Sequence, residues 1–152
     1  MGPIETASTL TRQFEGLRLK AYLCPAGVPT LGYGSTGPDI KLGMTCSREW
    51  AEQRMLMDLA AYWTRVRNTS PILLTQSGER GGAVLDWAYN LGTARYASST
   101  FRRRVDAQRW GDAANELRKW VYAGGKKLRG LELRREEEVK YFLLMADMVE
   151  RG

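Results

Sequence analysis

The spacing of apolar residues changes abruptly at Glu15 and Gly16, and this change constrains the fold more than any other feature of the chain. From Ile4 to Phe14, apolar residues recur every three or four positions, as on one face of a helix. Gly16 is the kind of residue that ends a helix. From Leu17 to Tyr22 apolar and polar residues alternate, and residues 28–33 are predicted to return as the second strand of a hairpin. Glu15 is therefore expected at a helix end that faces a hairpin.

The rest of the chain is predicted to be mostly helical. A short strand is expected at residues 40–42, followed by a long amphipathic helix over residues 47–67 with Ser47 as its N-cap. Beyond Pro71 only helices are expected: from Thr75 or Ser77 to Asn90, then 100–106, 112–121, and 131 to about 148. The 152 residues fit one domain of the α+β class.

Reactive side chains concentrate in and just before the predicted hairpin, where Glu15, Cys24 and Thr30 precede a Gly-Tyr-Gly turn. The sequence contains no histidine, which excludes Ser-His and Cys-His nucleophile pairs and makes a zinc enzyme unexpected. Cys24 and Cys46 are too few for a disulfide scaffold. A disulfide between them in an oxidising compartment would consume the Cys24 thiol. Acid–base chemistry must therefore come from carboxylates, thiols, lysine or tyrosine.

The order Glu-Gly-x-x-Leu-x-Ala-Tyr-x-Cys-x-x-Gly-x-x-Thr-x-Gly-Tyr-Gly-x-Thr resembles the phage-type lysozymes, the muramidase endolysins of tailed phages, in particular the lambdoid group. In that family Glu is followed by Asp or Cys after eight intervening residues and by Thr after five more, and Glu15, Cys24 and Thr30 have this spacing. Two further blocks are similar, Trp87 to Gly92 and Trp120 to Arg135. The resemblance covers nearly the whole chain.

The resemblance implies a lysozyme-like fold: a small N-terminal β-hairpin lobe (residues 15–46) and a larger helical lobe (1–14 and 68–152), joined by the long helix 47–67. It implies hydrolysis of the β-1,4 bond between N-acetylmuramic acid and N-acetylglucosamine in peptidoglycan, without cofactor or metal. One carboxylic acid must protonate the leaving oxygen, and Glu15 is the candidate. Cys24 is open to three roles, positioning a water, partial base or nucleophile; water positioning with Thr30, and hence inversion, is favoured.

Four further residues are candidates for substrate binding: Tyr33, Tyr89, Asn90 and Arg134. Tyr89 and Asn90 suit a sugar ring and its N-acetyl group, although a core tyrosine and a helix-end asparagine are the alternative reading. Arg134, or less favourably Arg135, is expected to pair with Glu15 as a C-terminal arginine does in the family.

The net charge of +6 favours an anionic partner. Peptidoglycan of the bacterial wall is the expected partner of a monomeric enzyme; a basic nucleic-acid-binding protein and a catalytically inactive wall-binding homologue are the alternatives. No apolar run approaches the roughly 18 residues that cross a bilayer, and residues 1–13 lack a basic-then-apolar leader. The expectation is storage in the host cytoplasm and action in the periplasm once the membrane is permeabilised.

Overall fold

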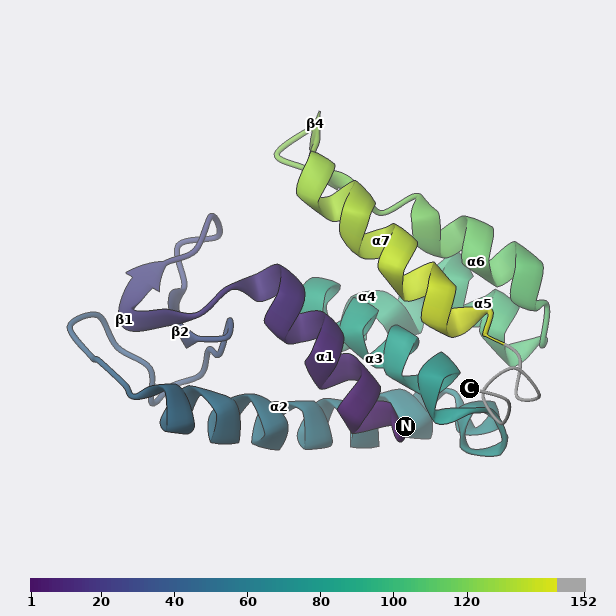
Figure 1. Ribbon diagram of the computed structural model, residues 1–152. Coiled ribbons are helices and arrows are strands. Elements are labelled where there is room, and N and C mark those ends of the chain that lie inside the picture. Colours follow the sequence, from purple (N-terminus) through teal and green to yellow (C-terminus); the bar gives the residue numbers. More distant parts are fainter. Residues whose placement is uncertain (145–152) are drawn as a thin grey trace.

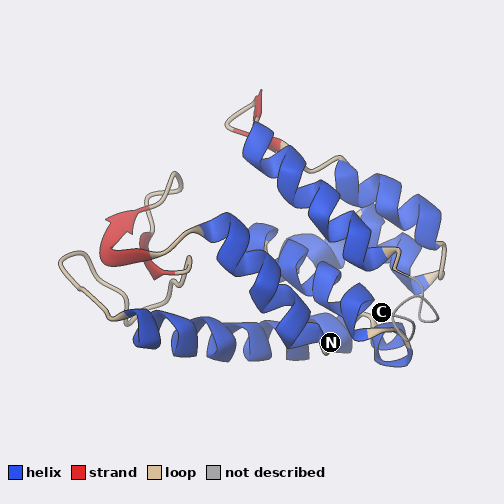
Figure 2. Cartoon of the chain, viewed as in Figure 1, coloured by secondary structure: helices blue, strands red, loops and turns tan. Residues whose placement is uncertain are grey.

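A computed structural model describes residues 1–144 and shows two lobes that share one long helix (Figure 1). Helices dominate, and the strands form two small hairpins at opposite ends of the chain (Figure 2). The elements in chain order are α1 (Pro3–Glu15), β1 (Arg18–Leu23), β2 (Pro29–Gly32), α2 (Arg48–Thr69), the 3-10 helix η1 (Pro71–Thr75), α3 (Gly78–Leu91), α4 (Thr93–Ser98), α5 (Thr100–Asp106), α6 (Trp110–Arg118), β3 (Tyr122–Ala123), β4 (Lys126–Lys127) and α7 (Arg129–Phe142). The predicted α+β, mostly helical, lysozyme-like class is confirmed.

The hairpin lobe, residues 16–47, is built on the antiparallel pair β1 and β2, in which Tyr22 lies opposite Thr30. The prediction of a strand at residues 40–42 is wrong. Turns flank it: the Ile40 amide donates to Gly37 and the Met44 amide to Lys41. Residues 44–46 take its place beside β1 and bridge it through the pair Lys20 and Thr45. Ile40 instead packs into the small core of this lobe with Ala21 and Leu31.

Helix α2 runs beneath both lobes and connects them (Figure 1). Ser47 caps it as predicted, because its Oγ accepts a hydrogen bond from the Trp50 amide. Its buried side chains, four residues apart at first, form the stripe that faces the rest of the protein: Ala51, Met55, Leu59 and Val66. Arg54 on the same helix forms ion pairs with Asp39 and Asp58. The start of the helix and the loop of the hairpin lobe are thereby held together.

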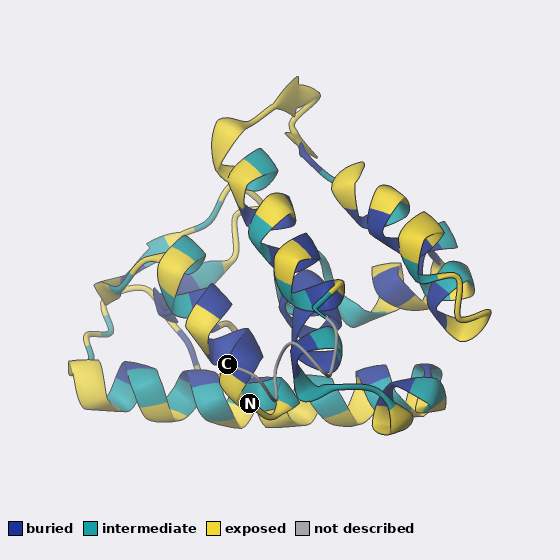
Figure 3. Ribbon diagram, turned by 45° about the vertical axis from the view of Figure 1, so that its right-hand side comes forward, coloured by how far each residue is buried: buried dark blue, intermediate teal, exposed yellow. Residues whose placement is uncertain are grey.

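The helical lobe surrounds α3, which is buried along most of its length (Figure 3). Ser77, one of the two predicted caps, begins α3, and Gly92 ends it. Close packing against α1 explains the glycine at position 82 near the start of α3. A Cβ on Gly82 would lie 2.4 Å from Thr6 Cβ, so glycine lets α1 and α3 approach closely. Around Trp87 cluster the aromatic rings of Tyr96, Phe101 and Trp120.

The C-terminal part departs most from the prediction. The helix expected over 112–121 begins at Trp110 and ends at Arg118, and the Gly124-Gly125 pair makes the turn of the exposed β3–β4 hairpin. The short helix α4 was not predicted. Helix α7 ends at Phe142; residues 145–148 of the predicted helix lie outside the described residues. Among residues 1–144, no helix is both long and apolar enough to cross a membrane.

Candidate active site

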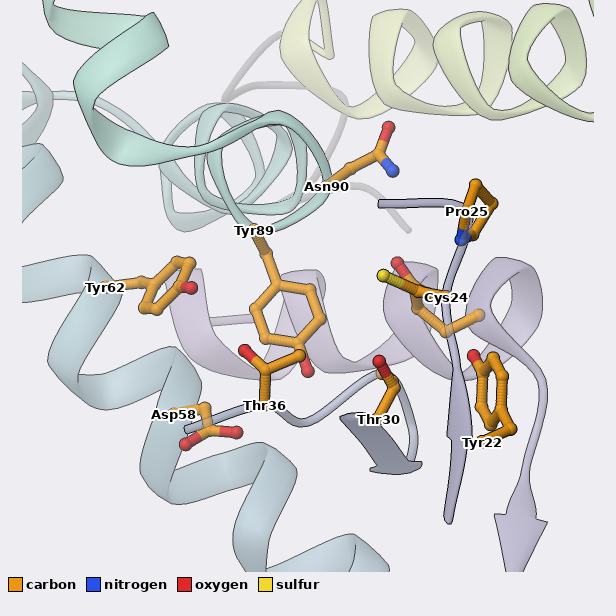
Figure 4. A pocket seen from close by; sticks show the side chains of 11 residues that line it. Tyr22, Cys24, Pro25, Thr30, Thr36, Asp58, Tyr62, Tyr89 and Asn90 are labelled. Carbon is orange, nitrogen blue, oxygen red and sulfur yellow. The ribbon is translucent and has the colours of Figure 1, made fainter. Parts of the chain in front are cut away.

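A cavity of about 370 Å³ opens between the hairpin lobe and the helical lobe (Figure 4). Cys24 and Thr30 lie on the hairpin side, Asp58 and Tyr62 of α2 on the opposite side, and Tyr89 and Asn90 of α3 between them (Figure 4). The lining residues are Glu15, Tyr22, Cys24, Pro25, Thr30, Gly34, Thr36, Asp58, Tyr62, Tyr89 and Asn90. The two lobes therefore meet at a polar, aromatic cleft that contains five of the seven predicted site residues.

Glu15 is the last residue of α1, and Gly16 turns the chain away with a φ of 71°. Its side chain is 21% exposed, and its Oε1 accepts a hydrogen bond from Arg134 Nη1 at 2.8 Å. The ion pair expected between these two residues is present. Arg134 lies behind Glu15 rather than in the cleft, and its side chain is 4% exposed.

Asp86 completes the buried ion cluster behind Glu15. Its two oxygens accept from Arg134 Nε at 2.9 Å and Nη2 at 2.7 Å, and Thr11 donates to it at 2.9 Å. Burial disfavours the charged form, but the Arg134 charge and these hydrogen bonds outweigh it and lower the pKa of Asp86 to about 2. Because the pKa is depressed from 3.8, this stabilisation is present above that pH and is lost as the pH falls towards 2.

Cys24 follows β1 at the mouth of the cleft, where its amide donates to Val28 O and its carbonyl accepts from Gly27. Thr30 lies on β2 and donates its hydroxyl proton to Val28 O at 2.9 Å. Hydrogen bonds from the backbone of Val28 and then Ala26 lower the pKa of the Cys24 thiol, with a smaller contribution from Thr30. Both Cys24 and Cys46 are free thiols. The thiol is therefore more acidic than an ordinary cysteine and stands beside a hydroxyl.

Tyr89 and Asn90 form the wall contributed by α3. The Tyr89 hydroxyl donates to Tyr33 O at 2.8 Å, and the Tyr89 ring lies 5.4 Å from that of Tyr62. Arg135 Nη2 donates to Asn90 Oδ1 at 2.8 Å and fixes the orientation of this amide, whose nitrogen is turned towards the cleft (Figure 4). An aromatic face next to an amide donor is suited to a sugar that carries an N-acetyl group.

Tyr33 is placed elsewhere than predicted, because its side chain is buried in the core and is 7% exposed. Its carbonyl, rather than its ring, supports the site. Tyr22, Asp58 and Tyr62 were missed as lining residues. The last two lie one helical turn apart, so a polar pair four residues apart in an amphipathic helix was the available signal. Asp86, within the apolar run 83–88, was also missed, although an acid at such a position requires a buried partner.

Gly34 is expected to be essential for the position of the Glu15 carboxyl. A Cβ at residue 34 would lie 2.8 Å from Glu15 Oε2, and φ is 81°. We expect Gly34→Ala to reduce activity roughly tenfold, because a displaced acid no longer meets its substrate correctly. Gly43→Ala is the matched control, since φ there is 92° and nothing lies within 4 Å of the added carbon.

Both variants should lose about 1 to 2 kcal/mol of unfolding free energy through backbone strain, measured by urea denaturation. Only Gly34→Ala should lose activity at protein concentrations where both variants remain folded. Equal activities of the two variants would contradict this role of Gly34.

A hairpin lobe, a helical lobe and a glutamate in the cleft between them define the fold and site of a lysozyme. The family model described as phage lysozyme matches residues 12–138. The chain belongs to the phage lysozyme family.

Individual relatives agree with this assignment. The SAR-endolysin of Bacteriophage PS34 is 37% identical over 126 residues, which cover 82% of this chain and 73% of the relative. The solved endolysin from Escherichia coli O157:H7 phage FAHEc1 is 30% identical with a TM-score of 0.78, over 94% of both chains. The muramidase domain of SpmX from Asticaccaulis excentricus is 27% identical with a TM-score of 0.83, over 95% of this chain and all of that domain (100%).

Proposed function

We propose that this chain is a phage endolysin that hydrolyses the β-1,4 bond between N-acetylmuramic acid and N-acetylglucosamine in peptidoglycan. Membership of the phage lysozyme family and the endolysin relatives support the activity. The observation that carries the assignment to this cleft is Glu15, held at one point by Arg134 and standing in the same cavity as Cys24 and Thr30. A glycosidase needs such an acid on one side of the bond and a water-activating group on the other.

In the proposed mechanism, Glu15 in its protonated form donates to the glycosidic oxygen as the bond breaks. Cys24 and Thr30 hold the attacking water, and the Cys24 thiolate, the stronger hydrogen-bond acceptor, takes up the proton that the water loses as it attacks. A water held by side chains that form no covalent bond to the sugar attacks directly, so the product configuration is inverted. Tyr89 and Asn90 contact the sugar. Arg134 does not contact the sugar and acts through its hydrogen bond to Glu15. No residue of this mechanism requires a cofactor or metal.

The proposed place of action is the peptidoglycan of the periplasm. We propose that the enzyme is a monomer that is made in the host cytoplasm and reaches the wall after the membrane is permeabilised. It neither inserts stably into the membrane nor binds nucleic acid. Its positive charge of +6 suits an anionic wall polymer.

The test is incubation of the purified protein with peptidoglycan sacculi, followed by mass spectrometry of the released fragments. The expected products carry N-acetylmuramic acid at the reducing end, and NMR of fresh product should show the inverted anomer first. Sedimentation with sacculi but no release of fragments would instead support an inactive wall-binding protein. Strongly salt-dependent DNA binding without hydrolysis would support the nucleic-acid alternative.

A further inference from the structure

We propose that Asp86 is a positioning residue that acts through Arg134 on the acid Glu15, so that it sets the pH range over which Glu15 can donate a proton. This inference rests on the proposed function, because it takes Glu15 to be the general acid. Asp86 lines no part of the cleft and touches Glu15 only through the guanidinium between them.

The geometry makes Arg134 a bridge between two carboxylates. Asp86 occupies Nε and Nη2 in a two-point fork, and the remaining terminal nitrogen, Nη1, is left for Glu15. A bidentate fork fixes the plane of a guanidinium, whereas a single bond does not. Asp86 therefore determines where Nη1 points and limits Glu15 to one hydrogen bond from Arg134.

Three helices hold Asp86 in place. It lies on α3, accepts the Thr11 hydroxyl from α1 and binds Arg134 of α7. Helices α1 and α3 pack along one another and α7 lies against both (Figure 1). Asp86 is 0% exposed, so its charge is screened much less than that of a surface carboxylate. The charge of Asp86 therefore acts strongly on the neighbouring guanidinium of Arg134.

The other charged groups around the cluster do not replace Asp86. Burial, and next the neighbouring Asp86, raise the pKa of Glu138, so this carboxyl ionises less readily than Asp86, and it lies farther from Arg134 Nε, at 3.9 Å. Arg135 pairs with Glu138 and Asn90. Burial also raises the pKa of Tyr22 and Tyr89, the phenols whose pKa responds to the charge of Glu15. The remaining titratable groups of the cleft are Cys24, Asp58 and Tyr62, and Asp58 is paired with Arg54.

The consequence concerns the balance between the two forms of Glu15. Asp86 neutralises Arg134, so the cation favours the ionised form of Glu15 only partly. Without the Asp86 charge, Arg134 acts more strongly on Glu15 and favours the carboxylate, which cannot donate a proton. The alkaline limb of the pH–rate profile, above which the acid is ionised, therefore moves to lower pH.

The experiment compares the pH dependence of kcat/KM for the parent, Asp86→Asn and Thr11→Val on a soluble peptidoglycan oligosaccharide. Asp86→Asn keeps the shape and a hydrogen-bond acceptor but removes the charge. Its alkaline limb should move down by about one pH unit, with a roughly tenfold loss of rate above that limb. Thr11→Val is the matched control, because it removes a hydrogen bond to the same carboxylate without changing charge. Its limb should not move.

Two further variants show whether the effect passes through Arg134. Because Asp86 acts through this residue, the limbs of Arg134→Gln and of the double variant Asp86→Asn/Arg134→Gln should coincide. If Asp86→Asn alone does not fold, the comparison of Arg134→Gln with the double variant serves as the test. The double variant removes both charges of the Asp86–Arg134 pair, so neither is left buried and unpaired.

Two results would overturn the inference. One is an alkaline limb at the same pH in folded Asp86→Asn as in the parent. The other is a pH difference between the limbs of Arg134→Gln and the double variant that is as large as the difference between the parent and Asp86→Asn. Failure of the proposed function gives a different result, because the parent would then be inactive or Glu15→Gln fully active.

Discussion

Replacing Glu15 by glutamine is expected to reduce hydrolysis of peptidoglycan by about a thousandfold, the typical contribution of a general acid. Glutamine has nearly the same shape, and its amide oxygen can still accept the hydrogen bond from Arg134. It has no proton to give to the leaving oxygen, so the loss is chemical rather than structural. Release of reducing ends from sacculi measures the loss, and thermal unfolding checks that the variant is folded.

Glu137→Gln is the control for removing a glutamate from an ion pair. Glu137 binds Lys140 at 2.7 Å on the surface of α7, away from the cleft, and this variant should keep full activity. If Glu15→Gln retained more than about a tenth of the parent rate, Glu15 would not be the acid.

The second large effect is expected at Cys24. Cys24→Ala should lose about a hundredfold in kcat, because it removes the acceptor that holds the attacking water. Cys24→Asp should stay close to the parent, since a carboxylate is an acceptor of similar reach, and Cys24→Ser should lie between the two. Rates on an oligosaccharide substrate measure this series, with unfolding curves to establish that each variant is folded.

The pH dependence of this series identifies the active form of Cys24. Its pKa is lowered from 9.0 by backbone hydrogen bonds, so the thiolate is populated earlier as the pH rises. If the thiolate is the acceptor, the parent rate falls as the pH is lowered through the pKa of the thiol, which lies below 9.0, because the thiol becomes protonated. Cys24→Asp should not fall in this range, as aspartate ionises near pH ~3.9. Equal pH profiles would assign no role to the thiolate, and full activity of Cys24→Ala would exclude Cys24 from the mechanism.

Local patterns were sufficient where a segment packs mainly through its own periodicity. Helix α1, the β1–β2 hairpin and the cap at Ser47 were all predicted, because each is defined by neighbouring residues. The β3–β4 hairpin was missed. Its strands are two residues long and exposed, so no alternation of burial exists in the sequence to reveal them. The strand expected at 40–42 failed because turn residues on both sides prevent an extended pairing.

The site residues, too, were predicted where a local pattern contains them and missed where only tertiary packing brings them together. Glu15, Cys24 and Thr30 lie within one short stretch, and their spacing identifies them as candidate site residues. Asp58 and Tyr62 reach the cleft only through the course of α2, and Asp86 reaches Arg134 only through the packing of α3 on α7. Such partners depend on tertiary contacts between distant segments, which one sequence does not encode in any local pattern. Arg134 was anticipated solely through the family resemblance.

The consecutive residues Arg134 and Arg135 of α7 hold Glu15 and Asn90, which lie on two different helices. Glu15 and Arg134 are separated by 119 positions in the chain. During synthesis on a ribosome, the acid is therefore made well before its partner. A nascent or prematurely terminated chain that lacks α7 cannot assemble this site, so lytic activity begins only after α7 has been made.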